Sequence, residues 1–205
     1  MGFYQEQFVP RIIDVAMGGA SFAKIRQRVA GNLQGEVLEV GFGSGLNVPY
    51  YPDSVTRVQA VDPSTVGRGL ADKRVAKSTI PVEYVGLDGE SLPVETASID
   101  NVLMTWTMCT IPDVEGALGE TLRVLKKGGK LLFVEHGLSP NPEIAKWQRR
   151  LTPIQRRLFA GCHLDRPINE IVARSGFIIS ELNNYYLKGL GPLGYMYEGE
   201  AIKSL

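Results

Sequence analysis

The sequence contains little cysteine and little histidine, and neither sign of charge is in excess. Its 205 residues include two cysteines and two histidines, and 22 basic side chains balance 22 acidic ones. Two cysteines cannot form a disulfide framework, and the usual local spacing of zinc ligands is missing. A protein that binds nucleic acid through charge would carry a basic excess. We therefore expect no metal, no nucleic-acid partner and a reducing, cytoplasmic location.

Long hydrophobic runs are also missing. No stretch approaches the roughly 18 consecutive apolar residues that a membrane-spanning helix requires. Residues 5–7 are polar, whereas a signal peptide would need an apolar segment near this position. Hydrophobic residues still make up 44% of the chain, which is enough for a buried core. The sequence thus predicts a globular protein with no membrane-spanning helix.

Short apolar runs alternate with amphipathic segments after residue 35. The runs predicted to be buried strands are 37–40, 57–61, 82–85, 99–104 and 130–134. Segment 114–125 has leucines along one side and predicts a helix. Segments 177–187 and 193–203 flank a turn rich in glycine and predict an antiparallel hairpin. The pattern predicts an α/β fold with a mostly parallel sheet of seven strands, helices on both faces and a C-terminal antiparallel hairpin.

Residues 1–35 predict one or two helices that precede the first strand. A break is expected at Gly18–Gly19, with Ser21 as the N-cap of the second helix. Tyr4 and Phe8 are four residues apart and share one helix face. They are expected either to cover a ligand as a lid or to pack in the core.

The stretch 145–159 is basic and amphipathic. Thr152 and Pro153 fit the N-cap and first residue of a new helix, so the preceding helix is expected to end at Leu151. The stretch carries no acid and five cations, which are Lys146, Arg149, Arg150, Arg156 and Arg157. Such a segment suits either a solvated helix face or contact with a membrane surface.

The strongest functional pattern is a glycine loop that follows the strand 37–40. Gly41, Gly43 and Gly45 allow a tight turn and the close approach of a ligand to the backbone. The spacing is G-x-G-x-G, whereas the dinucleotide fingerprint is G-x-G-x-x-G, so a tight structural turn remains the alternative. Glu39 precedes this loop in a strand that should be buried. A cationic ligand would explain the carboxylate, and the alternative is a partly exposed side chain.

Acidic residues follow the next two strands. Asp62 and Pro63 come after strand 57–61, where a carboxylate can accept hydrogen bonds from both hydroxyls of a ribose. The alternative is a helix cap or a turn. Asp88 follows the third strand and is placed to accept from an adenine amino group. Because open α/β sheets bind ligands at the carboxyl ends of their strands, these residues and the glycine loop predict one site.

Four motifs in this order resemble the class I S-adenosylmethionine-dependent methyltransferases over about residues 36–137. The motifs are VLEVGFGSG, VDPS, GLDGESLP and LRVLKKGGKLLFVEHG. The shorter segments TMCT, GCHLDR and YEGEA are similar to a subgroup that includes the alkyl-thiol S-methyltransferases of the endoplasmic reticulum and their soluble bacterial relatives. The resemblance implies a Rossmann-like fold, S-adenosylmethionine as cofactor and methyl transfer to a small-molecule acceptor, with a thiol favoured.

The resemblance also implies which segments of the chain bind the cofactor and which bind the acceptor. Residues 1–205 would form one methyltransferase domain, with a helical cap (1–35), a cofactor-binding half (36–137) and an acceptor-side half (138–205). The expected cofactor-binding residues are Glu39, Gly41, Gly43, Gly45, Asn47, Asp62, Pro63, Asp88, Gly89 and Thr105. Leu87 departs from the family pattern, in which a small or polar residue commonly precedes the acid.

The acceptor side offers few groups that can act as a base. The candidates are Glu135, His136, His163 and the tyrosines. His136 follows the fifth predicted strand and His163 adjoins Cys162, so we name both histidines as candidate catalytic residues; the alternative is a structural, hydrogen-bonded role. Cys109 and Cys162 are expected to be small core residues. A thiol acceptor has a pKa near 8.5 and is partly ionised without a base.

Two other functions stay open on the sequence. One is a methyltransferase at the membrane surface that acts on a lipid headgroup or a quinone through the basic stretch 145–159, by peripheral contact. The other is a protein that binds S-adenosylmethionine without transferring its methyl group. We expect a monomer or a weak homodimer.

Overall fold

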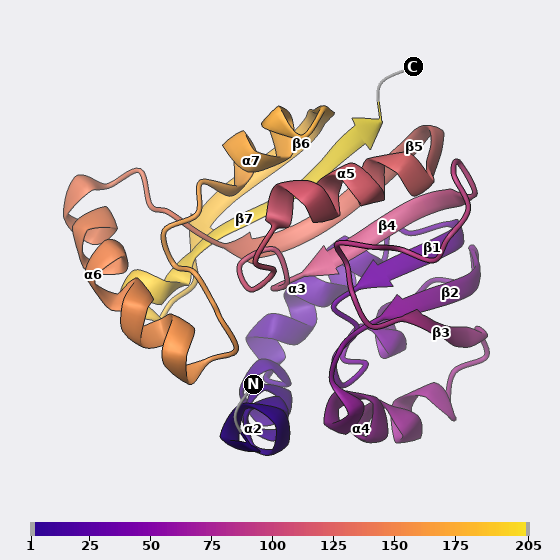
Figure 1. Ribbon diagram of the computed structural model, residues 1–205, viewed down its shortest axis with the longest axis horizontal. Coiled ribbons are helices and arrows are strands. Elements are labelled where there is room, and N and C mark those ends of the chain that lie inside the picture. The colour runs from indigo at the N-terminus through magenta and orange to yellow at the C-terminus, as the bar shows by residue number, and fades with distance from the viewer. Residues whose placement is uncertain (1–2, 204–205) are drawn as a thin grey trace.

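A seven-stranded sheet forms the centre of the molecule in the computed structural model, which describes residues 3–203 (Figure 1). The strand order is β3-β2-β1-β4-β5-β7-β6. Strands β1 to β5 are parallel, and β7 pairs antiparallel with both β5 and β6. This arrangement confirms the predicted α/β, Rossmann-like fold with its C-terminal antiparallel hairpin.

Every predicted strand and both hairpin strands are present. The strands are β1 (Gly35–Val40), β2 (Val55–Val61), β3 (Val82–Gly86), β4 (Ile99–Thr105), β5 (Leu125–His136), β6 (Phe177–Tyr186) and β7 (Tyr195–Lys203). The helices are α1 (Phe3–Gln7), α2 (Val9–Met17), α3 (Ala20–Ala30), α4 (Thr65–Val75), α5 (Val114–Val124), α6 (Pro142–Leu158) and α7 (Ile168–Arg174), with the 3-10 helices η1 (Val48–Tyr50) and η2 (Gly191–Gly194). Strand β5 begins before its predicted position because Gly128, at φ +74°, accommodates an irregularity within the strand.

Helices cover both faces of the sheet, as parallel strands with apolar side chains on both sides require. On one face, Leu118 of α5 and Ile168 of α7 are fully buried in a cluster with the strands. On the other face, Val29 of α3 and Ala71 of α4 belong to a second cluster. Figure 1 shows these two helical layers on opposite sides of the strands. The carboxyl ends of β1 to β5 therefore meet at one edge, where the site residues were predicted.

Helix α6 runs through Pro153, so the predicted break at Leu151 is wrong. A proline inside a helix lacks the N–H that would bond the carbonyl four residues earlier. Here the hydroxyl of Thr152 donates to the carbonyl of Gln148 at 2.9 Å. The side-chain amide of Gln148 also donates to two backbone carbonyls outside the helix, each at 2.8 Å. The carbonyl that loses its partner is that of Arg149, and the bonds of Gln148 tie the neighbouring part of the helix to the rest of the fold.

The N-terminal segment breaks where the glycines predict. Helix α2 ends before Gly18–Gly19 and α3 begins after them, with Gly19 rather than Ser21 as the N-cap residue. Ser21 lies inside α3, because Ala20 already has helical geometry. The rings of Tyr4 and Phe8 stack with centroids 6.1 Å apart, and both side chains are about half exposed. Core packing of this pair is therefore ruled out, and the lid remains a prediction.

Candidate cofactor and acceptor site

The glycine loop after β1 has a left-handed backbone at all three glycines. The φ angles are +80° at Gly41, +54° at Gly43 and +71° at Gly45. A Cβ on Gly41 would lie 2.1 Å from Oγ1 of Thr107, so glycine lets the loop close against the end of β4. A Cβ on Gly43 would meet only one atom, a backbone oxygen 3.9 Å away. The backbone at Gly43 is therefore open to a ligand.

Asp62 fixes this loop from the end of β2. Its Oδ2 accepts from the N–H of Gly43 and its Oδ1 accepts from the N–H of Ser64, both at 2.7 Å. Burial raises the pKa of Asp62, and the two hydrogen bonds oppose that shift. A cavity of about 220 Å³ opens beside this carboxylate and is also lined by Arg68 and Tyr84. Asp62 thus forms a turn, which the sequence left open as an alternative, and it also lies at a cavity.

Glu39 lies at the centre of a buried hydrogen-bond network. Only 1% of it is exposed, so the partly exposed alternative is wrong. Its carboxylate accepts from Nδ2 of Asn47 at 2.8 Å and from the hydroxyl of Tyr51. Asn47 also donates to Oγ1 of Thr105 at 2.9 Å and accepts from the Arg26 guanidinium at 2.8 Å. The network joins β1, β4, the glycine loop and α3.

Burial shifts the pKa values of both charged residues in this network, Glu39 and Arg26. Burial raises the pKa of Glu39 to about 7, although Tyr51, Asn47 and Arg26 each lower it. Burial also lowers the pKa of Arg26 to about 10, and its guanidinium lies 4.7 Å from the centre of the Trp106 ring. A positively charged ligand group beside Glu39 would favour its ionised form.

The loop after β3 meets the same edge of the sheet. A Cβ on Gly89 would lie 2.9 Å from the Val40 side chain, so this glycine packs closely against the end of β1. Asp88 is exposed and its Oδ1 accepts from the N–H of Glu90 at 2.8 Å, which forms a turn. Pro63 is exposed next to Asp62. The predicted cofactor residues therefore converge on the ends of β1 to β4.

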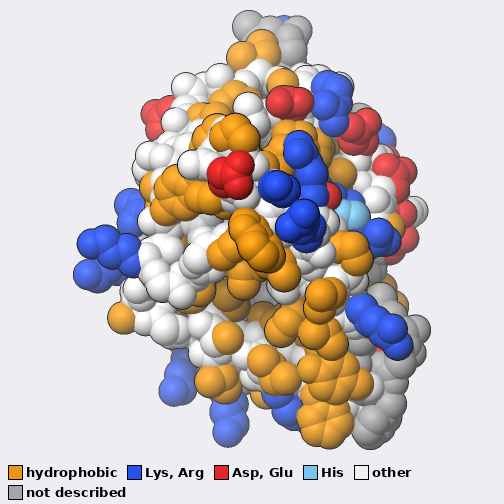
Figure 2. All heavy atoms as spheres, turned by 90° about the vertical axis from the view of Figure 1, so that its left-hand side faces the viewer, with side chains coloured by type: hydrophobic (Ala, Val, Ile, Leu, Met, Phe, Trp, Pro, Cys, Tyr) orange, Lys and Arg blue, Asp and Glu red, His pale blue; other side chains and the backbone are white. Residues whose placement is uncertain are grey.

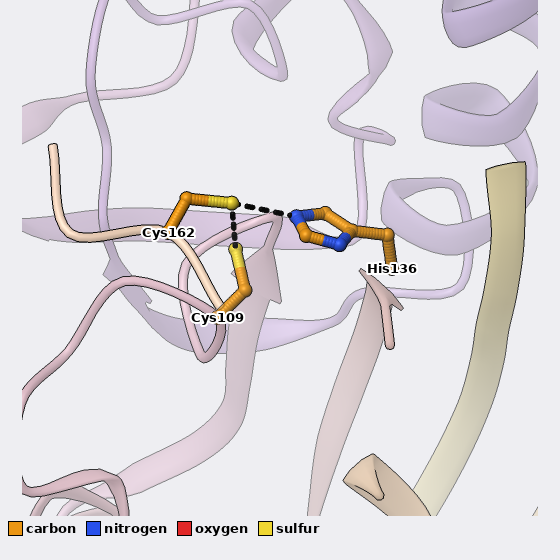
Figure 3. A group of neighbouring side chains, drawn as sticks. All are labelled: Cys109, His136 and Cys162. Atoms are coloured by element: carbon orange, nitrogen blue, oxygen red, sulfur yellow. Dashed lines mark hydrogen bonds between the residues drawn. The ribbon is translucent and has the colours of Figure 1, made fainter. Parts of the chain in front are cut away.

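Cys109, His136 and Cys162 form a compact cluster next to the ends of β4 and β5 (Figure 3). His136 ends β5, and its Nε2 lies 3.0 Å from Sγ of Cys162, which is 3.9 Å from Sγ of Cys109. Both cysteines are free and buried, as expected of core residues, but they contact each other and an imidazole. Hydrogen bonds with Cys109 and His136 lower the pKa of the Cys162 thiol. His163 lies apart from them, with Nδ1 3.6 Å from a carboxylate oxygen of Asp165.

Three residues gain roles that sequence reasoning did not assign. Arg26 and Tyr51 complete the Glu39 network, and no motif marks either residue, because only the packing of α3 and η1 brings them there. Glu135 is buried, and its carboxylate accepts from the backbone N–H groups of Thr107 and Met108. Burial raises the pKa of Glu135 to about 7. One carboxylate oxygen of Glu135 therefore supports the loop after β4, and the role of Glu135 as a base stays a prediction.

The fold and this edge define an α/β protein that binds a nucleotide-like ligand at the ends of its parallel strands. A family model described as "Methyltransferase domain" matches residues 38–133. The thiol S-methyltransferase TMT1B of Rattus norvegicus is 31% identical over 188 residues, which are 89% of this chain and 76% of that protein. The chain belongs to the class I S-adenosylmethionine-dependent methyltransferases.

Two further comparisons show how widely the relatives differ in acceptor. A phosphatidylethanolamine N-methyltransferase of Cereibacter sphaeroides is 27% identical over 169 residues, covering 75% of this chain and 78% of that protein. The solved structure of a geranyl diphosphate methyltransferase in complex with S-adenosylmethionine has a TM-score of 0.70 at 14% identity, over 89% of this chain and 84% of that one. The fold and the cofactor class are thus shared by proteins with unrelated acceptors.

The residues present fit S-adenosylmethionine. The carboxylate of Asp62 lies beside a cavity and holds the open backbone of Gly43, as a site for a ribose and an adenine ring would need. Glu39 and Arg26 offer one group of each charge for the amino and carboxylate groups of a methionine moiety. When bound, the cofactor supplies a methyl group already activated on a sulfonium.

Proposed function

We propose that this methyltransferase acts on a small-molecule thiol. The observation that carries the proposal is the similarity to a thiol S-methyltransferase along 89% of the chain. The acceptor side also suits a thiol, because its two buried candidate bases each already contact another protein group through one atom. His136 contacts Cys162, and Glu135 accepts from two backbone N–H groups. A thiol with a pKa near 8.5 is partly ionised at neutral pH, so its methylation needs alignment more than a strong base.

We propose that Asp62 accepts from the ribose hydroxyls while it continues to hold the N–H of Gly43. Glu39 pairs with the amino group of the methionine moiety, and Arg26 pairs with its carboxylate. The supporting contacts are the bonds of Asn47 to Glu39 and Arg26, which fix both charged groups at the same place. Thr105 accepts from both Asn47 and Arg26 and so holds the network to the end of β4.

The adenine side is proposed to consist of the exposed loops after β2 and β3. Pro63 would contact the ring, and Asp88 and Gly89 would line its edge. Support comes from the position of Gly89 against the end of β1 and from the cavity next to Asp62. Gly41 and Gly45 would shape the loop, since a Cβ would meet Thr107 at Gly41 and Ala71 at Gly45, whereas the space next to Gly43 is open.

The protein's part in the reaction is to align the acceptor sulfur with the methyl group and to exclude water. Helix α3 contributes to this enclosure. Phe22 packs edge-on against Trp106 with ring centroids 5.3 Å apart, and Arg26 lies over the same ring. Trp106 has φ +52°, an uncommon conformation for a bulky residue, at the end of β4. These contacts cover one side of the site next to Glu39.

The acceptor class is tested with methyl-labelled S-adenosylmethionine and a matched panel of thiols, phenols and amines of similar size. We expect labelled thioethers, and we expect little product from the phenols and amines. The Asp62→Ala variant serves as the control that removes the proposed ribose contact and should lose product with every acceptor. Methylation of phenols or amines without methylation of any thiol would overturn the proposed acceptor.

A second candidate acceptor is a lipid headgroup at a membrane surface, and the outer face of α6 favours it. Trp147, Ile154 and Leu158 are each about half exposed, between the cations of this helix. Figure 2, which looks at the α6 side of the molecule, shows hydrophobic side chains in patches beside lysine and arginine. Within residues 3–203, no helix has both the length and the apolar composition needed to cross a membrane, so this contact would be peripheral.

The two candidates are separated by sedimentation with vesicles that contain phosphatidylethanolamine and an anionic phospholipid. A lipid-directed enzyme should sediment with these vesicles and methylate the amine headgroup. The Trp147→Ala variant should sediment less, and Trp106→Phe, at a largely covered position, provides a control for the loss of a tryptophan elsewhere. Protein that stays in the supernatant and yields no methylated lipid would remove this candidate.

A further inference from the structure

Both cysteines of the chain and one of its two histidines meet at one point. Cys109 lies in the segment after β4, His136 ends β5, and Cys162 follows α6. Their nitrogen and sulfur atoms all lie within 4.8 Å of one another. Figure 3 shows the two thiols directed toward each other and the imidazole directed toward Cys162.

We propose that Cys109, His136 and Cys162 form a binding site for a thiophilic divalent cation, for which Zn²⁺ is the best fit. Thiolate and imidazole are preferred zinc ligands. With Zn–S near 2.3 Å and Zn–N near 2.0 Å, tetrahedral angles place two sulfurs about 3.8 Å apart and a nitrogen about 3.5 Å from each sulfur. The two sulfurs here are 3.9 Å apart. The imidazole nitrogen lies 3.0 Å from Sγ of Cys162 and within 4.8 Å of Sγ of Cys109, so metal binding requires the His136 side chain to shift until its nitrogen is equally distant from both sulfurs.

The protein holds the two cysteine segments together through bonds that do not involve the thiols. The backbone N–H of His163 donates to the carbonyl of Cys109 at 2.8 Å. The guanidinium of Arg166 donates to the carbonyls of Met108 and Ile111, on either side of Cys109. The fold itself therefore brings the ligands into position. Metal binding then costs less conformational entropy, because the two segments are already ordered.

Burial and charge also favour a divalent ion at this place. Cys109 is 2% exposed and Cys162 is 6% exposed, and buried thiolates need a compensating charge. Two thiolates, a neutral imidazole and one Zn²⁺ have no net charge. Within residues 3–203, Nδ1 of His136 has no hydrogen-bond partner, so no other protein group holds this ring away from the cluster.

Three protein ligands leave one tetrahedral position for water or another small ligand. The cluster lies near the glycine loop, because Thr107, which a Cβ on Gly41 would touch, is two residues from Cys109. Sequence spacing gave no sign of this site, since the two cysteines are 53 residues apart and the histidine belongs to a third segment. The expectation of no metal rested on the small number of cysteines and histidines and on their spacing along the sequence.

The test uses the full-length, tag-free protein, reduced and treated with a chelator, then titrated with Co²⁺ under anaerobic conditions. We expect one equivalent to give a thiolate-to-cobalt charge-transfer band and the visible bands of a tetrahedral ion, both removed by Zn²⁺. Any such band must arise from this cluster, because the chain has no other cysteine. A wild-type protein with both thiols free and no charge-transfer band would overturn the proposal.

Variants locate the site. Cys162→Ser and His136→Ala should each lower the affinity for Co²⁺ at least tenfold, because losing even a residue that only orients a ligand costs about 10- to 100-fold. His163→Ala is the matched control, because it removes the other histidine and keeps the backbone bond to Cys109. An equal loss in His163→Ala would contradict the assignment.

If a cysteine variant folds poorly, wild-type thermal unfolding decides the question. Zn²⁺ should raise the unfolding temperature of the wild-type protein, because an ion that binds only the folded state stabilises it by mass action. The shift should be retained in His163→Ala. No shift with saturating Zn²⁺ in the wild-type protein would refute the site independently of any variant.

Discussion

The proposed role of Glu39 makes cofactor affinity depend on pH. Burial raises the pKa of this carboxyl to about 7, and pairing with the amino group of the methionine moiety requires the ionised form. The ionised fraction then falls from about three quarters at pH 7.5 to about 3% at pH 5.5. The dissociation constant should rise by the ratio of these fractions, about 25-fold, or about 2 kcal/mol.

The assay is isothermal titration calorimetry with S-adenosylhomocysteine at pH 5.5, 6.5 and 7.5. The Glu39→Gln variant is the matched control, because it keeps the size of the side chain and removes the titrating group. We expect it to bind weakly with little dependence on pH, and the shared ligand cancels any titration of the ligand itself. A wild-type change below about threefold, or the same 25-fold change in Glu39→Gln, would refute the role of Glu39.

The raised pKa of Glu39 also makes the free energy of unfolding of the ligand-free protein fall as the pH rises. The folded pKa of Glu39 lies above the ordinary value of 4.5, so the folded state holds the proton more tightly. The stabilisation of the folded state by this proton is fully present below pH 4.5 and is lost as the pH rises through 7. The loss in the free energy of unfolding is at most about 3 kcal/mol. Glu135 has a similar shift, so the comparison with Glu39→Gln by denaturant unfolding isolates Glu39.

Three further substitutions test other parts of the site and fold. Asp62→Ala should weaken S-adenosylhomocysteine binding by about 1–3 kcal/mol in calorimetry, the size of a lost hydrogen bond to a charged group, whereas the exposed Asp53→Ala should not. Unchanged affinity in Asp62→Ala would exclude the ribose contact. Gly41→Ala should destabilise the protein by about 1–3 kcal/mol, because its φ is +80° and the new Cβ would overlap Thr107; an unaltered unfolding temperature would contradict this reading. Pro153→Ala should stabilise the protein by up to about 3 kcal/mol, since α6 regains a backbone donor, and a loss of stability would show that the proline is needed.

The sheet and much of the candidate cofactor site follow from local patterns. A buried parallel strand is a short apolar run between turn signals, and a glycine loop has to follow such a strand to bind a ligand, so β1 and Gly41 to Gly45 were predictable together. Asp62 was predictable as well, because it comes directly after the next strand. These patterns predict the order of the strands and helices and the edge of the sheet at which the strands end.

The remaining features depend on tertiary packing. Pro153 predicts a helix end, but α6 continues through it, and only the fold shows that the Gln148 amide binds two carbonyls outside the helix. Arg26 reaches Asn47 because α3 packs against the sheet edge, and nothing in its local sequence marks it. Side chains that contact each other from distant parts of the chain leave no periodic pattern in the sequence.

The central claim is that the carboxyl ends of β1, β2 and β4 hold S-adenosylmethionine through Glu39 and Asp62. A crystal structure with bound S-adenosylhomocysteine tests it most directly. The account predicts the ribose hydroxyls within hydrogen-bond distance of Asp62, the amino group beside Glu39 and the sulfur facing the acceptor side. A ligand bound elsewhere, or bound at this edge with neither carboxylate in contact, would contradict it.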